Sequence, residues 1–287
     1  MDFYFLSRLD ILVTGSWDKT IRIWDGRTPV SLDTDYSWRI KVPGKVYALD
    51  MDHDCLVVAT SDDYDPKNFQ VNGFSSQGSS DTNKGGYFHT YDLRKLSEAT
   101  LSLLDGNPGL VLKPSYSAAS SMAYRTRILK CIPPPTPSQY RRVTGGFVYS
   151  SVDGSVGLIY HNEPQTTISM ATYGLQQNGR FESYPINAIA FNPKIQGFFA
   201  CGGSSGHVET WHPSTTKSIQ KFPRSDLSVS ALTYMPNGKR MVVAYGDTFD
   251  NPSPTSAPDR RKVEPRIVIR AADLDPDQLL VQPMDLA

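Results

Sequence analysis

The sequence is poor in cysteine, in net charge and in helical periodicity. Its three cysteines, Cys55, Cys131 and Cys201, fit no zinc-binding spacing, and their odd number argues against a secreted disulfide framework. Each lies in an apolar, strand-like run, so we expect reduced, buried thiols in an intracellular protein. The 29 basic and 29 acidic residues cancel, so no long-range field favours nucleic acid or an anionic membrane as a partner.

A long hydrophobic run is also missing. The apolar start of the chain, residues 1–13, is interrupted by Arg8 and Asp10, which leaves it too short to span a bilayer. No small-residue cleavage site follows it, so we predict neither a targeting segment nor a membrane partner.

Glycine, proline and aromatic residues are plentiful, which suits many short strands joined by turns. The clearest unit begins with a strand-like run at residues 12–16. Trp17, Asp18 and Lys19 form a turn, in which the short carboxylate is suited to pair with turn amides. Residues 20–24 then alternate polar and apolar side chains with a period of two. The unit closes on Trp24 and Asp25, the dipeptide typical of a propeller blade.

The same strand–turn–strand rhythm recurs down the chain. The five units run over residues 12–25, 46–92, 124–161, 187–211 and 229–270. They predict an all-β fold, a WD40 β-propeller spanning residues 1–271 with about five recognisable blades. The first unit lacks its first strand and the last lacks a fourth, so we expect an incomplete ring. Polar or proline-broken inserts at 62–86 and 97–119 predict mobile loops, and 272–287 a flexible tail.

Five strings of residues resemble one known family. They stand at residues 13–29, 42–51, 120–133, 150–161 and 184–193. The chain resembles the spindle-checkpoint WD-repeat family, the third member of the budding-uninhibited-by-benzimidazole group, and its close relative in messenger-RNA export. The resemblance covers residues 11–270 and implies a seven-bladed pattern, of which roughly the first two blades have no counterpart here.

The resemblance implies a non-enzymatic scaffold in the nucleus and at kinetochores. One propeller face binds a GLEBS peptide of checkpoint kinases or, in the alternative, of a nucleoporin, and the checkpoint member also reads phosphothreonine repeats of a kinetochore scaffold. The positions that correspond to the peptide-binding face are Trp17, Tyr124 and Arg127, with Lys194 retained as a further cation. An exposed aromatic side chain beside cations suits an acidic, extended peptide.

One departure from the family pattern concerns phosphate. Where family members carry an arginine, this chain has Ser155, and a hydroxyl cannot replace a guanidinium at a charge-assisted phosphate contact. We therefore expect phosphorylation of a threonine in the peptide to add little affinity.

Simpler interpretations stay open at each position. An exposed turn tryptophan such as Trp17 also serves simply to cover a neighbouring blade. Arg125 and Arg127 share one face of a strand, as on a solvated edge. A propeller hydrolase is the alternative from another class, but no nucleophile elbow G-x-S-x-G with partners stands out. The histidines show no HExxH spacing or ligand pairing. We expect no catalytic residue, no metal and no cofactor. The histidines are His53, His89, His161, His207 and His212.

Overall fold

The computed structural model describes thirteen stretches of the chain, and their regular structure consists of strands apart from one 3-10 helix, η1 (Leu93–Glu98). The described residues are 2–6, 11–25, 37–52, 54–61, 85–98, 100–104, 107–133, 145–160, 168–172, 174–177, 180–212, 218–247 and 264–272. The expected mobile insert at 62–86 lies outside them except for its last two residues, and so does the expected tail except for Ala272.

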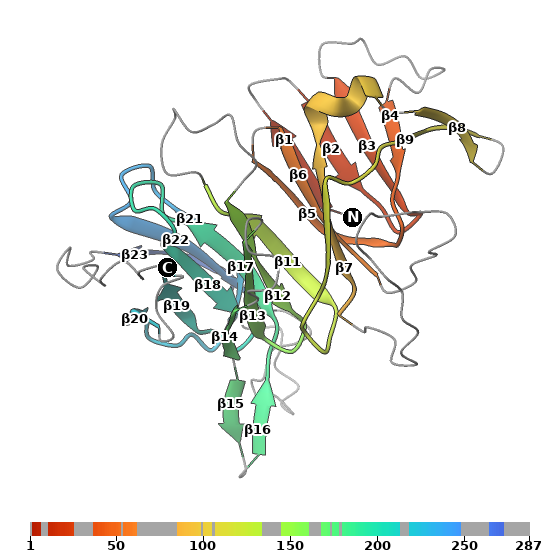
Figure 1. The fold of residues 1–287 in the computed structure, drawn as a ribbon. Helices are drawn as coiled ribbons and strands as arrows, with labels where there is room; N and C mark the ends of the chain where they lie inside the picture. Colours follow the sequence, from red (N-terminus) through yellow and green to blue (C-terminus); the bar gives the residue numbers. More distant parts are fainter. Residues whose placement is uncertain are drawn as a thin grey trace, which may run out of the picture.

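Five antiparallel sheets follow one another along the chain as propeller blades, which confirms the predicted fold class (Figure 1). The first two blades contain, in sheet order, β1 (Asp2–Leu6), β2 (Ile11–Gly15), β3 (Thr20–Asp25) and β4 (Ser37–Lys41), and then β5 (Val46–Asp52), β6 (Cys55–Thr60), β7 (Tyr87–Asp92) and β10 (Tyr116–Ala119).

The third blade contains β11 (Thr126–Cys131), β12 (Gly146–Ser151), β13 (Ser155–Tyr160) and β14 (Ile168–Thr172). The fourth blade contains β17 (Ile186–Phe191), β18 (Phe199–Gly203), β19 (Val208–Trp211) and β20 (Gln220–Lys221). The fifth blade contains β21 (Ser228–Tyr234), β22 (Arg240–Gly246) and β23 (Arg266–Ala271).

Two hairpins lie outside this pattern. One consists of β8 (Thr100–Leu104) and β9 (Asn107–Val111), and β9 extends the first sheet by running parallel to β4. The other, β15 (Gly174–Gln177) and β16 (Arg180–Ser183), projects from the blades between the third and the fourth (Figure 1).

The innermost strands hold the arc together. Contacts join β1 to β5, β5 to β11, β11 to β17 and β17 to β21, and no comparable contact joins β21 to β1 within the described part of the chain. Apolar side chains fill the spaces between successive sheets. Apolar burial of this kind is the main term that favours the folded state.

The structure corrects the expectation that the first blade lacks its first strand. Residues 2–6 form β1, which pairs along its whole length with β2. Only four residues separate the two strands, a loop length that is ordinary for a hairpin. The interval 97–119, where the sequence predicts a loose connection, contains β8, β9 and β10. Within the described residues the last blade has three strands.

The three cysteines are buried and none of them forms a disulfide, as expected. Burial raises the pKa of the Cys131 and Cys201 thiols well above the usual value, so both are neutral thiols at physiological pH. They act as small apolar core residues.

His89 on β7 gives the fold a measurable pH dependence. The side chain is buried, its Nδ1 lies 2.8 Å from Ser117 Oγ, and its Nε2 has no hydrogen-bond partner within the described residues. Burial lowers the pKa of the imidazole from 6.5 to about 4. The unfolded chain therefore binds more protons than the folded one between these pH values, so stability falls as pH drops through this window.

We expect the free energy of unfolding to be about 2 kcal/mol lower at pH 5 than at pH 7 because of His89. Urea unfolding at the two pH values measures the difference, and His89→Asn, which keeps a polar group near Ser117, removes that part of it. An unchanged pH dependence in His89→Asn would show that other groups cause it.

Candidate functional site

The ends of the strands form two rims, and one of them carries the predicted aromatic residues. Among the described residues, this front rim contains the turns between the second and third strands of the first, third and fourth blades, together with the starts of β5, β11 and β17. Backbone hydrogen bonds tie these parts together: Val46 N–H donates to Ser16 O at 3.1 Å and Val152 N–H to Arg125 O at 3.0 Å. The back rim contains the turns that follow β17 and β21.

Trp17 stands on the front rim in a turn that its neighbours stabilise. Asp18 Oδ1 accepts hydrogen bonds from Thr20 N at 3.0 Å and Thr20 Oγ1 at 2.6 Å, and Ser16 Oγ accepts one from Asp18 N at 3.3 Å. Partial burial raises the pKa of Asp18, but these hydrogen bonds outweigh it, so the pKa lies below its usual value. The turn holds the Trp17 side chain out of the core, with 65% of its surface exposed.

Trp17 contacts the second blade through Tyr47 on β5. The two rings meet edge to face, with centroids 6.2 Å apart and an interplanar angle of 77°. The guanidinium carbon of Arg125, from the third blade, lies 5.5 Å from the centroid of the Tyr47 ring. Side chains of three blades thus form a continuous row of aromatic rings and a cation, a geometry that favours ring–ring and cation–π attraction.

Two further residues that the sequence singles out, Tyr124 and Arg127, stand on either side of Arg125 in the chain. Tyr124 is 54% exposed in the bend before β11. Arg127 is held by the fourth blade, because its Nε donates to Asn187 Oδ1 at 2.9 Å. The Asn187 amide nitrogen in turn donates to Ser204 Oγ and to Val229 O, both at 2.9 Å. One asparagine thus fixes the arginine and connects the third, fourth and fifth blades.

We call Trp17, Tyr47, Tyr124, Arg125 and Arg127 the candidate surface. Sequence reasoning found three of these residues and missed Tyr47 and, as a member of the site, Arg125. Tyr47 stands in an alternating strand, where a tyrosine is read as a core residue. Tyr47 is identified as a site residue only by its contact with Trp17 across the boundary between the first two blades. That contact is visible only in the folded structure.

The structure does not bring Lys194 to the candidate surface. Lys194 follows β17 in the turn on the back rim, and its side chain lies next to Gly238 in the turn between β21 and β22. Asn187 stands near the front end of the same strand, so the length of β17 separates the two positions, at about 3.3 Å per residue.

Ser155 begins β13 on the front rim and is nearly buried. Its hydroxyl donates to Asp153 Oδ2 at 3.0 Å, and its N–H donates to Asp153 Oδ1 at 3.1 Å. The residue therefore stabilises the turn at residues 152–154. Asp18 and Asp153 both act as turn acceptors, which confirms the structural interpretation of these two acids.

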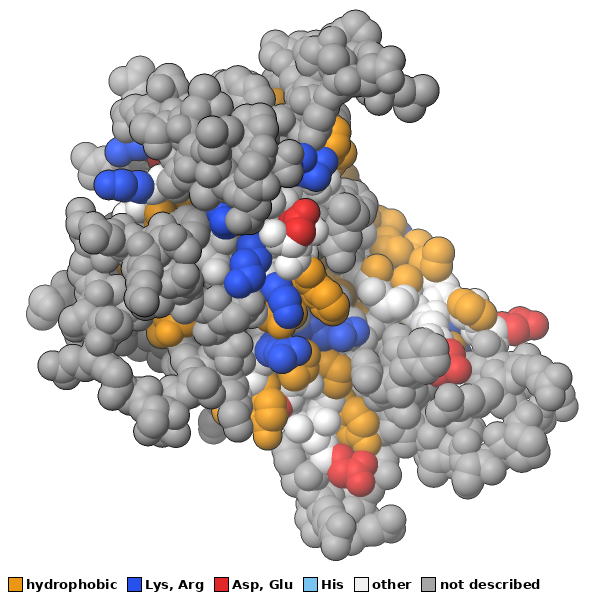
Figure 2. All heavy atoms as spheres, turned by 90° about the vertical axis from the view of Figure 1, so that its right-hand side faces the viewer, with side chains coloured by type: hydrophobic (Ala, Val, Ile, Leu, Met, Phe, Trp, Pro, Cys, Tyr) orange, Lys and Arg blue, Asp and Glu red, His pale blue; other side chains and the backbone are white. Residues whose placement is uncertain are grey.

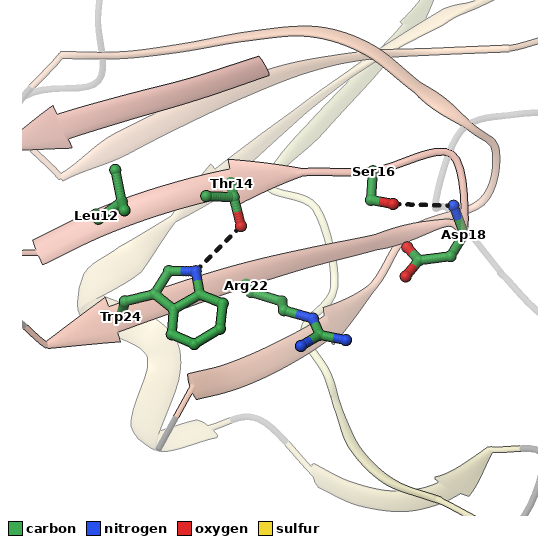
Figure 3. A pocket seen from close by; sticks show the side chains of 6 residues that line it. All are labelled: Leu12, Thr14, Ser16, Asp18, Arg22 and Trp24. Carbon is green, nitrogen blue, oxygen red and sulfur yellow. Dashed lines mark hydrogen bonds between the residues drawn. The ribbon is translucent and has the colours of Figure 1, made fainter. Parts of the chain in front are cut away.

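A hollow of about 390 Å³ lies on the face of the first blade that points away from the second (Figure 3). Its hydrogen bonds are structural: Trp24 Nε1 donates to Thr14 Oγ1 at 3.1 Å. The corresponding tryptophan of the fourth blade, Trp211, packs against the third blade and is buried. The hollow is thus an uncovered blade face. Its lining residues are Leu12, Thr14, Ser16, Asp18, Arg22 and Trp24.

Cations border this hollow. Arg22 stands opposite Arg39 on β4, and its guanidinium carbon lies 5.9 Å from the centroid of Trp24. Figure 2, which faces the side of the molecule that contains the first blade, shows Lys and Arg side chains gathered next to hydrophobic ones.

The described residues contain no group of three or more His, Cys, Asp or Glu side chains placed to hold a metal ion. None of the helical structure in the same part of the chain is long and apolar enough to cross a bilayer. The described part of the front rim presents exposed aromatic rings and cations.

Comparison with known proteins agrees with this geometry. Residues 2–25 match the family model "WD domain, G-beta repeat". The mitotic checkpoint protein BUB3.1 of Arabidopsis thaliana is 27% identical over 252 residues, which cover 86% of this chain and 60% of that protein. The chain is similar to mitotic checkpoint proteins. The predicted resemblance to this checkpoint family and to its export relative is thereby confirmed.

Besides the mitotic checkpoint proteins, the chain is similar to an RNA export protein and to a solved β-propeller domain. The Poly(A)+ RNA export protein of Schizosaccharomyces pombe is 25% identical over 243 residues, or 84% of this chain and 53% of that protein. The solved β-propeller domain of Cps50 (Swd1) from Myceliophthora thermophila matches 86% of this chain and 62% of its own, with a TM-score of 0.57 at 14% identity, and supports the fold alone. The chain spans about 60% of the length of the checkpoint relatives.

Proposed function

We propose that this chain is a non-enzymatic WD-repeat scaffold that binds an extended, acidic peptide of checkpoint kinases on its front rim. The observation that supports the proposal is the row of Trp17, Tyr47 and Arg125 across three blades, with Arg127 fixed beside it. The similarity to mitotic checkpoint proteins supplies the biological setting. By that similarity the protein acts in the spindle assembly checkpoint, in the nucleus and at kinetochores.

The candidate surface has the chemistry of a peptide anchor. Binding energy at such surfaces is concentrated in tryptophan, tyrosine and arginine side chains. The exposed indole of Trp17 offers apolar area, and Arg125 and Arg127 offer cations for carboxylates. Because the row follows the rim from blade to blade, an extended peptide lying along it contacts several blades at once.

A second candidate is messenger-RNA export, with a nucleoporin peptide on the same surface. The matches to export proteins of Schizosaccharomyces pombe and Chaetomium thermophilum favour it, at 25% and 24% identity. Both candidates use a GLEBS-type peptide, so the partner distinguishes them. Titration with labelled peptides from a checkpoint kinase and from a nucleoporin tests the proposal. Binding of neither peptide at tens of micromolar by folded protein would contradict it.

We expect phosphorylation of a peptide threonine to change the affinity by less than about threefold. The hydroxyl of Ser155 is already engaged by Asp153, and no guanidinium stands at this position to pair with a phosphate, so an exposed contact there adds little. Fluorescence anisotropy with a matched pair of kinetochore-scaffold peptides, phosphorylated and plain, measures the ratio. A tenfold or greater preference for the phosphopeptide would show that other cations of the rim read the phosphate.

A further inference from the structure

Within the described residues, the last strand of the fifth blade has an open edge. In the other four blades a fourth strand pairs with the third: β4 with β3, β10 with β7, β14 with β13 and β20 with β19. Among the described residues β23 pairs only with β22, so its outer backbone groups face no strand there. An edge of this kind is a template for a further strand.

The side chains of β23 give this edge an apolar centre. Ile267 is 75% exposed and Ile269 is 56% exposed. They stand opposite Ala244 and Val242 of β22, and therefore project from the same face of the sheet as these two small side chains. Val268 points to the other face and packs in the core between the fourth and fifth blades. Large exposed apolar side chains side by side on an edge mark an interaction site.

Arg266 and Arg270 stand on either side of this centre along the strand, and their side chains project from the other face, that of Val268. Arg266 Nη2 donates to Ser225 Oγ at 3.0 Å, and its guanidinium carbon lies 5.7 Å from the centroid of the Tyr245 ring, so its position is fixed. The Nε of Arg270 is buried and has no hydrogen-bond partner within the described residues. An incoming carboxylate supplies the acceptor that this donor lacks.

We propose that β23 is a docking edge for an extended segment of a partner protein that carries acidic residues at positions i and i+4 and apolar residues at i+1 and i+3. The segment adds to the sheet as an antiparallel fourth strand, as in other cases of β-strand addition. Its acids then stand opposite Arg270 and Arg266, and its apolar side chains opposite Ile269 and Ile267. The proposal is independent of peptide binding on the front rim.

The sequence of β23 argues against a second copy of the chain as the occupant. Arg-Ile-Val-Ile-Arg reads the same in both directions. Antiparallel pairing of two copies centred on Val268 therefore places Arg266 of each opposite Arg270 of the other. Like charges in directly opposed cross-strand positions are destabilising, whereas opposite charges there are favourable.

The test uses two labelled peptides with the cores Glu-Val-Thr-Val-Glu and Lys-Val-Thr-Val-Lys, titrated against the full chain by fluorescence anisotropy. We expect the acidic peptide to bind at least about tenfold more tightly, because two favourable pairs replace two repulsive ones. In the variant Arg266→Glu/Arg270→Glu the preference should reverse. Trp17→Ala, which alters the front rim, should leave both affinities unchanged and so separates this edge from the proposed function.

Hydrogen exchange shows whether the acidic peptide binds at β23, and whether another segment or a second copy of the chain already covers this edge. In the free protein we expect the outward amides of residues 266–271 to exchange freely, and to become protected when the acidic peptide binds. Protection in the free protein would overturn the proposal, since another segment of the chain or a second copy then covers the edge. A dimer in light scattering, or equal binding of the two peptides, would overturn it as well.

Discussion

Replacing Asp50 by alanine should lower the free energy of unfolding by about 3 kcal/mol, among the largest expected effects of a single change in this protein. Asp50 is buried on β5, where its Oδ1 accepts from Lys130 Nζ at 2.9 Å and its Oδ2 accepts from the Cys131 N–H at 2.8 Å. Both donors belong to β11, so the carboxylate joins the second blade to the third. Burial raises the pKa of this carboxyl, while Lys130 and the Cys131 amide oppose the shift.

The size of the effect follows from what the substitution leaves behind. Cys131 N–H loses its acceptor in a buried place, and the Lys130 ammonium, which is partly exposed, loses its counter-charge but keeps access to water. Urea unfolding measures the loss. The double substitution Asp50→Leu/Lys130→Met should restore part of the stability, because replacing a buried pair by apolar side chains is often neutral.

Glu209→Ala is the matched control for Asp50→Ala. Glu209 pairs with the exposed Lys221 across β19 and β20 at 3.3 Å, on the periphery of a single blade. Lys221 is 71% exposed and keeps its access to water, so the loss of this pair should cost less than about 1 kcal/mol. If Asp50→Ala costs no more than Glu209→Ala, the ion pair does not join the blades as described.

The second large effect concerns binding. Trp17→Ala should weaken the affinity for the GLEBS-type peptide of the front rim by about 30-fold, which corresponds to a hot spot of about 2 kcal/mol. The free energy of unfolding should stay within about 0.5 kcal/mol of the wild type, because the side chain is mostly exposed and its turn is held by Asp18 and Thr20. Isothermal titration and urea unfolding of the same preparations measure the two quantities.

Two further variants show whether the effect is specific. Trp17→Phe keeps a ring next to Tyr47 and should retain most of the affinity. Lys194→Ala removes a cation from the back rim and should leave the affinity unchanged. Equal losses for Trp17→Ala and Lys194→Ala would mean that the peptide lies elsewhere or that the variants act through the fold.

The sequence predicts the inner strands well and the outer ones poorly. Runs such as residues 55–60 and 240–246 are recognisable because their apolar side chains face neighbouring blades on one or both sides. The outer strands β10 and β20 have four and two residues, and no apolar period can show in so few positions. Their pairing is decided by the third strand beside them, a tertiary effect that local propensity does not contain.

The same limit applies to the candidate surface. Trp17 can be identified from the sequence because turns favour small polar residues, and a large aromatic side chain at this position is unusual. Tyr47 and Ile267 occur in ordinary strand patterns, and their exposure follows from where the blades meet or end. The sequence likewise grouped Lys194 with Arg127, although the two residues lie at opposite ends of neighbouring strands.

The central claim is that an acidic, extended peptide binds along the front rim. Hydrogen exchange of the wild-type chain with and without a GLEBS-type peptide tests it most directly. We predict new protection in residues 16–20, 45–48 and 121–128, and unchanged exchange in the back-rim turns at 192–197 and 235–239. Protection confined to the back rim, or none at peptide concentrations that saturate binding, would contradict it.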